Sequence, residues 1–168
     1  RRRRGTDEAD LSTSIIDGAE VHRGKVVGHG AFGTVFHGEW RSMHVAVKEI
    51  RVDDAATIEM FRREAHRMAS VVPHDNVVQF FGVTLEPFCI VTRFARGGSL
   101  DRLLYGEHTN DDGGGGGASA LGAVANDDGR VPLPIKLRLH WIIGLARGLS
   151  HLHREGVVHR DVAARNVL

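Results

Sequence analysis

The sequence has almost no cysteine: Cys89 is the only one among its 168 residues. One cysteine cannot form an internal disulfide, which excludes the class of small secreted domains that disulfides hold together and fits a reducing compartment. Because Cys89 lies in the apolar run 88–91, we predict that it is a small buried hydrophobic residue.

Long hydrophobic runs and an excess of one charge are also missing. No stretch approaches the roughly 20 apolar residues of a membrane span, and the start shows no charged segment followed by an apolar one. The formal net charge is only +1, so no general basic field favours nucleic acid, and the run Arg1–Arg4 is interpreted as a solvated end. We expect no nucleic-acid partner, no membrane segment and a cytoplasmic location, either free or as the cytosolic part of a larger membrane-linked parent.

The chain does contain enough apolar sequence for one domain. Hydrophobic residues make up 42% and charged residues 26% of it, which excludes a disordered protein. We divide it into a flexible lead-in over 1–20 and a domain over 21–168, whose two parts are 21–95 and 96–168. A polar segment over 106–130, with five consecutive glycines, is predicted to be a flexible insert. The chain begins without an initiator methionine, so we expect both ends to be cuts from something longer.

Hydrophobic spacing predicts a first part rich in strands and a second part rich in helix. Strand patterns, broken by a glycine turn and a polar bend, occupy 26–50, and two further strands are expected over 77–83 and 88–92. Apolar residues at helical spacing predict helices over 55–72 and 135–153. The second helix is apolar over much of its circumference, so we expect it to lie inside a domain.

Three glycines in the first part, Gly28, Gly30 and Gly33, allow the backbone to approach phosphate oxygens. A dinucleotide-binding turn has the same spacing, and Glu49 lies about where its ribose-binding acid is expected. That fold requires a helix directly after the last glycine, whereas 34–36 continue as strand. No Gly-Lys-Ser/Thr closes the run either, so a Walker-type loop is excluded.

Two further groups of residues can handle phosphate and protons. Strand alternation places Ala46 and Lys48 on one face, where a small residue can lie against a purine and a cation can reach phosphate. Glu64, inside the apolar stripe of the first helix, needs a partner and can hold Lys48 in an ion pair. Downstream, Asp161 can accept a hydroxyl proton, and five positions later Asn166 offers an amide oxygen suited to Mg²⁺.

Together, the glycine turn Gly28–Val35, the strand Val45–Lys48 and the string His159–Asp161 with Asn166 resemble the eukaryotic protein kinase superfamily. The resemblance covers the whole domain apart from the insert, and the tail Ala163–Asn166 is similar to the tyrosine kinase and tyrosine-kinase-like groups. It implies an α+β, protein-kinase-like fold: a five-stranded antiparallel N-lobe with one main helix, followed by a partial helical C-lobe.

The resemblance also implies an activity, the ATP-dependent transfer of the γ-phosphate to a hydroxyl of a protein substrate, with Mg²⁺. It makes Lys48 and its partner Glu64 phosphate-positioning residues and Asp161 the catalytic base. It makes Asn166 a ligand of Mg²⁺ and includes Arg165 among the catalytic residues.

The implied ATP site lies around the glycine turn and the end of the predicted sheet. In kinases the backbone of a hinge, here 93–95, bonds the adenine edge, and a gatekeeper, here Thr92, stands before the pocket behind it. Apolar side chains cover the adenine from above, and Leu168 forms its floor. The nucleotide-binding residues implied in this way are Val27, Gly28, His29, Gly30, Ala31, Phe32, Gly33, Thr34, Val35, Ala46, Lys48, Thr92, Ala95 and Leu168.

Several alternatives stay open. The acceptor hydroxyl is either tyrosine or serine/threonine, because the tail after Asp161 occurs in both groups. A non-catalytic function, as a pseudokinase-like or truncated binding module, competes with the enzyme, since the Mg²⁺-binding aspartate expected downstream is not in this sequence. We therefore expect the isolated chain to be inactive even where its parent is active. A metal site at His151 and His153 is disfavoured, because residues two apart on a helix do not share a face.

Overall fold

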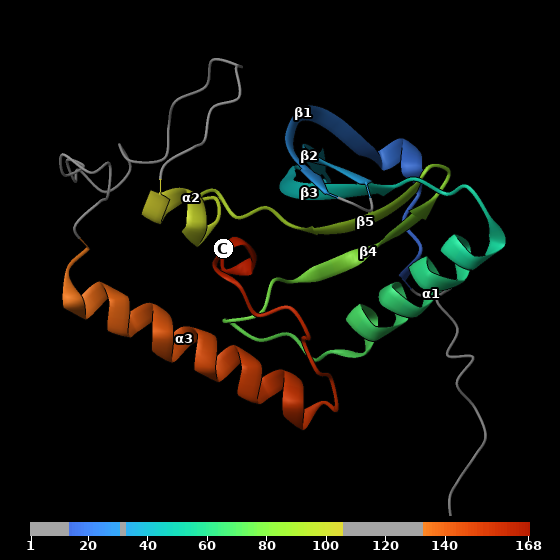
Figure 1. Ribbon diagram of the computed structural model, residues 1–168. Helices are drawn as coiled ribbons and strands as arrows, with labels where there is room; N and C mark the ends of the chain where they lie inside the picture. Colours follow the sequence, from blue (N-terminus) through green and yellow to red (C-terminus); the bar gives the residue numbers. More distant parts are fainter. Residues whose placement is uncertain (1–13, 31–32, 106–132) are drawn as a thin grey trace, which may run out of the picture. The chain divides into compact units, whose positions relative to one another are not determined.

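The computed structural model describes residues 14–30, 33–105 and 133–168. The chain divides into two compact units: unit 1 is Arg1–Pro73 with Val78–Phe94, and unit 2 is His74–Val77 with Ala95–Leu168. Figure 1 shows the strands and helix α1 of unit 1 and the helical segments of unit 2.

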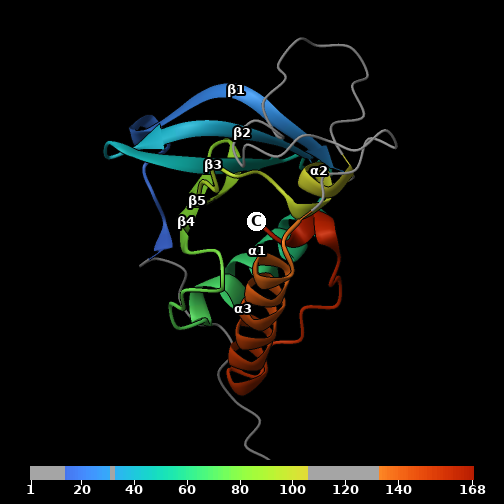
Figure 2. The same ribbon diagram turned by 90° about the vertical axis from the view of Figure 1, so that its left-hand side faces the viewer.

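Unit 1 contains a five-stranded antiparallel sheet in the order β1-β2-β3-β5-β4 (Figures 1 and 2). Its strands are β1 (Val21–Gly30), β2 (Gly33–Trp40), β3 (Met43–Ile50), β4 (Phe80–Leu85) and β5 (Phe88–Arg93). The antiparallel five-stranded sheet with one main helix is confirmed. Several boundaries differ from the expectation. Strand β1 begins at Val21 rather than at residue 26, and the bend between β2 and β3 is a turn of only two residues. Strand β4 begins three residues late, because Val77 N–H bonds back to the carbonyl of His74 in a turn.

Unit 1 has two clusters of buried hydrophobic residues, and one of them lies on the face of the sheet opposite to Lys48. Val45 and Val47 have no exposed surface and pack with Cys89, Val91 and Ile16. The alternation along β3 is thus confirmed, since its buried valines point away from the face that carries the intervening residues. Cys89 is buried as predicted, and burial raises the pKa of its thiol.

Residues 14–20, which the sequence assigns to a flexible lead-in, are packed against the sheet of unit 1. Ile16 is 8% exposed, and its N–H donates to the carbonyl of Val83 at 2.7 Å, while Ile15 forms a parallel bridge with the same residue. The 3₁₀ helix η2 (Gly18–Glu20) follows directly. The edge strand β4 offers unpaired backbone groups, which this segment satisfies. The remainder of the expected lead-in, 1–13, lies outside the described residues.

Helix α1 (Ala55–Ser70) covers part of the sheet and brings one acidic residue to it. Asp54 caps its start by accepting hydrogen bonds from the N–H and the hydroxyl of Thr57. Phe61 and Ala65 are buried against Val83 on β4 and a neighbouring residue of β5. Because Glu64 lies between these two buried residues in sequence, this packing sets the side of the helix from which it projects.

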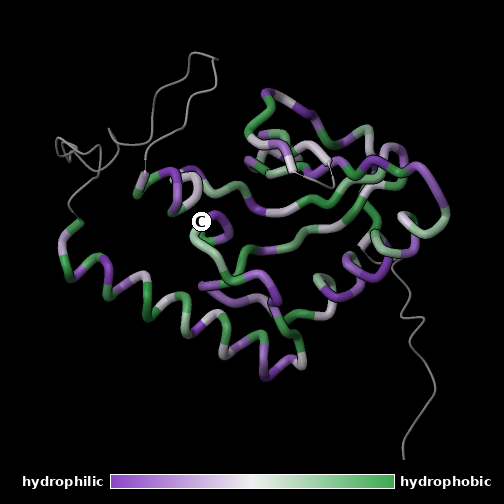
Figure 3. The backbone as a smooth tube through the Cα atoms, viewed as in Figure 1, coloured by the Kyte–Doolittle hydropathy of each residue, from purple (hydrophilic) through white to green (hydrophobic). Residues whose placement is uncertain are grey.

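Unit 2 is built from α2 (Leu100–Tyr105), α3 (Ile135–Arg154) and the 3₁₀ turn η4 (Ala164–Asn166). The long predicted helix is confirmed, and Figure 3 shows hydrophobic and hydrophilic residues alternating along it. His74 stacks on His151 of α3, with ring centroids 4.6 Å apart. The expected insert over 106–130 lies outside the described residues. Within the described parts of the chain, no helix combines the length and the apolar character that crossing a membrane demands.

Candidate active site

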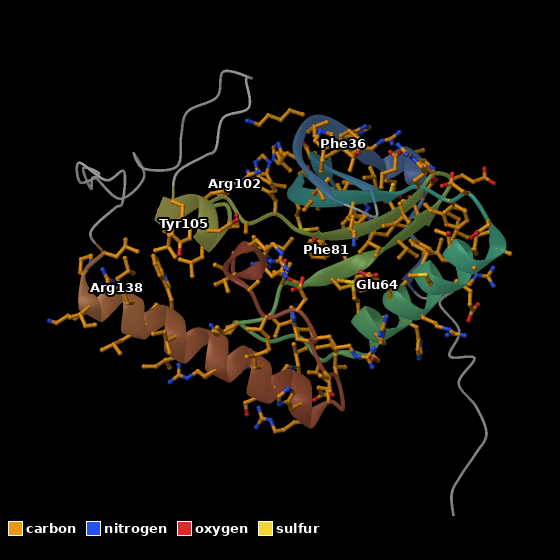
Figure 4. The ribbon with its side chains drawn as sticks, in the orientation of Figure 1. Phe36, Glu64, Phe81, Arg102, Tyr105 and Arg138 are labelled. Carbon is orange, nitrogen blue, oxygen red and sulfur yellow. The ribbon has the colours of Figure 1, made fainter. Side chains whose placement is uncertain are left out.

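The cation of Lys48 is held by Glu64 in unit 1. Lys48 Nζ lies 3.5 Å from Glu64 Oε1, and the two side chains are 35% and 46% exposed. Glu64 projects from α1 toward the sheet (Figure 4). The predicted ion pair is therefore present. A pair this exposed contributes at most about 1 kcal/mol to stability, so its effect is to orient the ammonium group rather than to hold the fold together.

The three glycines of the turn differ in what the fold requires of them. A Cβ on Gly33, whose φ is +149°, would lie 1.9 Å from the carbonyl oxygen of Glu49, so this position needs glycine for structural reasons. A Cβ on Gly28 or Gly30 would have its nearest neighbour at an ordinary 3.9 Å. The first two glycines thus leave open space beside the backbone, which a ligand can approach.

The dinucleotide-binding alternative is excluded by what surrounds this turn. Strand β2 begins at Gly33 itself, and no helix follows the last glycine. Glu49, the possible ribose acid, forms an ion pair with Arg23 on the face of the sheet opposite to that of Lys48. Its carboxylate therefore belongs to the side of the sheet that carries Val45 and Val47.

Three of the residues expected around adenine, Val35, Ala46 and Thr92, share one face of the sheet with Lys48. Ala46 is the Cα partner of Thr92 on β5, and Lys48 is the partner of Val35 on β2. Alternation directs these side chains to the same side. The backbone N–H of Phe94, in the expected hinge, donates to the carbonyl of His44 on β3 at 3.3 Å. The backbone N–H of Phe94 is therefore already used in a hydrogen bond within unit 1.

The structure brings most of the expected nucleotide residues into unit 1 but not all of them. Thr34 Oγ1 and His29 Nδ1 lie 3.5 Å apart across the β1–β2 pair. Ala95 and Leu168 belong to unit 2, and Ala31 and Phe32 lie outside the described residues. The expected residues placed in unit 1 are Val27, Gly28, His29, Gly30, Gly33, Thr34, Val35, Ala46, Lys48 and Thr92.

The catalytic candidates of unit 2 form a network around Asp161. Arg165 donates to Asp161 Oδ1 at 2.5 Å, and the amide nitrogen of Asn166 donates to Oδ2 at 2.9 Å and to the Asp161 carbonyl at 2.8 Å. The imidazole Nδ1 of His159 accepts from the backbone N–H of Asp161 at 3.3 Å. Arg160, between them, has a φ of +65°. This turn brings the amide of residue 166 back to the carboxylate.

These hydrogen bonds set the charge of the site. The amide of Asn166, and then the guanidinium of Arg165, lower the pKa of Asp161 below its ordinary value. The carboxylate is therefore ionised at neutral pH and can accept a proton. Since Asn166 uses its nitrogen on Asp161, its amide oxygen points away from that carboxylate and can serve a hard cation, as the chemistry of a Mg²⁺ site requires.

The family of this chain follows from its similarity to known protein families. Residues 21–168 match the family described as protein tyrosine and serine/threonine kinase. The chain belongs to this kinase family. Members use ATP and a metal ion, and the match spans every residue placed above in the candidate site.

Among curated relatives, the kinase domain is 37% identical over 96% of the chain to the Probable serine/threonine-protein kinase gdt9 of Dictyostelium discoideum. It is 31% identical over 91% of the chain to mitogen-activated protein kinase kinase kinase 10 of Xenopus laevis, and 31% over 94% to mitogen-activated protein kinase kinase kinase 7 of Homo sapiens. The chain spans only 10%, 14% and 23% of these three relatives, respectively.

Two contacts of this kinase domain lie outside the motifs of its sequence. The N–H of Leu100, at the start of α2, donates to the carbonyl of Val167 at 2.8 Å, which fastens the end of the η4 turn. On the sheet, His37 and His44 contact one another on the Lys48 face. No local motif marks the first contact, but alternation along β2 and β3 could have indicated the second.

Proposed function

We propose that this domain, in its full-length protein, binds ATP with Mg²⁺ and transfers the γ-phosphate to a hydroxyl group of a protein substrate. The observation that carries the proposal is the state of Asp161, an ionised carboxylate oriented by Asn166 and Arg165. A general base needs both the right protonation state and a fixed orientation. A scaffold that never turns over has no need of either.

The residues of unit 1 are proposed to bind and position the nucleotide. Gly28 and Gly30 leave room for phosphate oxygens to approach backbone N–H groups, and Lys48 offers a cation whose direction Glu64 sets. Ala46 offers a small surface to the adenine on the same face of the sheet. Thr92, its partner on β5, is proposed as the gatekeeper.

The residues of unit 2 are proposed to handle the proton and the metal. Asp161 accepts the proton of the attacking hydroxyl and holds that oxygen in line, while Arg165 keeps the carboxylate ionised. Asn166 is proposed to hold one Mg²⁺ through its amide oxygen. When bound, the ion neutralises charge on the β- and γ-phosphates.

For the acceptor we propose serine or threonine. The support is a relative named as a probable serine/threonine-protein kinase, which is 37% identical to this chain. The tail Ala163–Asn166, which resembles tyrosine kinases, supports the competing acceptor. We also propose a cytoplasmic location, because the single buried cysteine fits a reducing compartment. Peptides that differ only in carrying Ser, Thr or Tyr at one position separate the acceptors.

The test uses the full-length protein, γ-labelled ATP and those peptides. Asp161→Asn is expected to lower the catalytic rate about 10²- to 10⁴-fold with ATP binding retained, and Lys48→Met is expected to lose phosphate positioning. Asp53→Asn, an exposed carboxylate before α1, is the matched control and is expected to act like the parent. Undiminished turnover in both site variants contradicts the proposed roles. Nucleotide binding without turnover in the parent itself favours the non-catalytic alternative.

A further inference from the structure

Two histidines from neighbouring strands of unit 1 face each other at close range. Nε2 of His37 on β2 lies 3.1 Å from Nδ1 of His44 on β3. The two ring planes are 23° apart, and the ring centroids are 5.1 Å apart. The pair has no role in the proposed phosphoryl transfer.

The strand register adds two further candidate ligands to the same face. His44 is the direct Cα partner of Glu39 on β2, and Glu39 is the direct partner of His22 on β1. His37 stands two residues before Glu39, so alternation places all four side chains on one side of the sheet. Directly opposed residues have Cβ atoms about 4.5–5.5 Å apart. Three neighbouring strands, seen side by side in Figure 2, thus supply three imidazoles and one carboxylate.

We propose that His37 and His44 are the primary ligands of a Zn²⁺ site, which Glu39 and His22 complete. Imidazole and carboxylate are common zinc ligands, with Zn–N distances of about 2.0–2.1 Å in a tetrahedral site. Two such ligands at the tetrahedral angle have nitrogens about 3.3 Å apart. The two nitrogens are observed 3.1 Å apart, so a small rotation of the two side chains is enough to reach this separation.

The remaining ligands are exposed and can reach the pair by rotation. Within the described residues, no three His, Cys, Asp or Glu side chains are already grouped as a metal site, so the third and fourth ligands must change rotamer. Glu39 and His22 are both exposed, which leaves them free to do so sterically. Zinc binding also requires each ring to carry its proton on the nitrogen away from the metal, Nδ1 in His37 and Nε2 in His44.

The proposed zinc site contacts Phe94, which directly follows strand β5. The ring of His37 packs on Phe94 with centroids 4.4 Å apart, and the N–H of Phe94 donates to the carbonyl of His44. A metal ion on the two imidazoles therefore also restrains residue 94. This inference does not depend on the proposed phosphoryl transfer, because all of its groups can bind metal whether or not the domain turns over ATP.

The experiment titrates the chain with Zn²⁺ by calorimetry and with Co²⁺ as a spectroscopic substitute. We expect one strong site with the visible absorption of four-coordinate Co²⁺. His37→Gln combined with His44→Gln should weaken binding by more than about tenfold, the smallest loss seen when even an outer partner of a metal site is removed. The matched control changes two exposed histidines of α3, His140→Gln with His153→Gln, and should leave the affinity unchanged.

Two outcomes would overturn the zinc site. One is a His37/His44 double variant that binds Zn²⁺ as tightly as the parent, and the other is a control variant that loses the same affinity. X-ray absorption of the unsubstituted chain loaded with one Zn²⁺ is a second measurement that needs no variant to fold. Fewer than two imidazoles in its first coordination shell would also reject the proposal.

Discussion

In unit 1 the residues proposed to act on ATP alternate with buried ones, whereas in unit 2 the proposed base stands in the open. Val45 and Val47, with no exposed surface, flank Ala46 and precede Lys48 on β3. The side chain of Asp161, by contrast, is 57% exposed and is held by hydrogen bonds from its neighbours.

The same contrast runs through the hydrophobic side chains of the two units. Of those that are buried in the described residues, only Leu133 and Leu152 lie in unit 2. On α3 the large side chains of Ile135, Leu139 and Ile142 are exposed. The geometry of Lys48 is thus a product of core packing, while that of Asp161 is a product of a short polar network. Substitutions of the core valines that flank Ala46 should therefore affect function through folding, whereas substitutions around Asp161 should act through local chemistry.

The largest expected effect compares a buried and an exposed aliphatic residue. Val47→Asp places an unpaired charge in the core and should lower the free energy of unfolding by more than about 4 kcal/mol. Ile142→Asp, at a position 61% exposed on α3, should change it by about 1 kcal/mol or less. Chemical denaturation of the chain followed by circular dichroism measures both. Equal losses would show that the α3 surface is as important to stability as the sheet core.

A second pair tests whether the segment before β1 belongs to that core. Ile16→Ala removes a buried side chain packed on Val45 and Val47 and should lower the free energy of unfolding by about 2 kcal/mol or more. Its neighbour Ile15 is 46% exposed, so Ile15→Ala should stay within about 0.5 kcal/mol of the parent. Chemical denaturation followed by circular dichroism measures the free energy of unfolding of both variants. If the two variants have the same free energy of unfolding, residues 14–20 are a lead-in and not part of the core.

A third pair separates a glycine that the fold needs from one that a ligand needs. Gly33→Ala should lower the free energy of unfolding by about 1–3 kcal/mol, because its φ is strained for other residues and Glu49 O is too close. Gly28→Ala has room for its Cβ and should retain stability, but it should weaken ATP binding by filling the space left for phosphate. Thermal unfolding and nucleotide titration are measured together. Full ATP affinity in Gly28→Ala argues against a phosphate contact there.

The sheet and the Lys48–Glu64 pair were predictable because they follow from periodicity. Alternation along one strand and the apolar stripe of one helix place the two charges on facing surfaces without any knowledge of distant contacts. Ile16 was not predictable in this way, since one buried residue in a polar segment has no period. Its burial depends on the open edge of β4, which exists only once the sheet has formed.

The short-range geometry of two clusters was unpredictable for another reason, namely unusual backbone angles. His37 and His44 meet because Arg41 and Ser42 form the β2–β3 turn with φ of 49° and 61°. Such turns favour Asn-Gly, so the Arg-Ser sequence did not indicate a two-residue turn at this point. In the same way, the positive φ of Arg160 precedes the turn that carries the Asn166 amide back to Asp161, and residue spacing alone does not contain that angle.

The smallest effect concerns the protonation of Asp161 and tests the polar network of unit 2. Because Asn166 and then Arg165 lower the Asp161 pKa, their hydrogen bonds to the carboxylate persist through mildly acidic pH and are lost only as pH falls through that lowered value. Asn166→Ala and Arg165→Ala should each raise the Asp161 pKa toward its ordinary value. Carboxyl carbon NMR titration reads this directly.

The control for this titration is an arginine that makes no contact with the carboxylate. Arg147→Ala, on the exposed side of α3, should leave the Asp161 pKa unchanged, which separates the local network from the general effect of removing one positive charge. The free energy of unfolding should hardly change in any of the three variants, because the Asp161 carboxylate is exposed to solvent. If all three raise the pKa equally, the charge of the chain rather than the hydrogen bonds sets it. The network would then be a consequence of the turn and would not determine the state of the base.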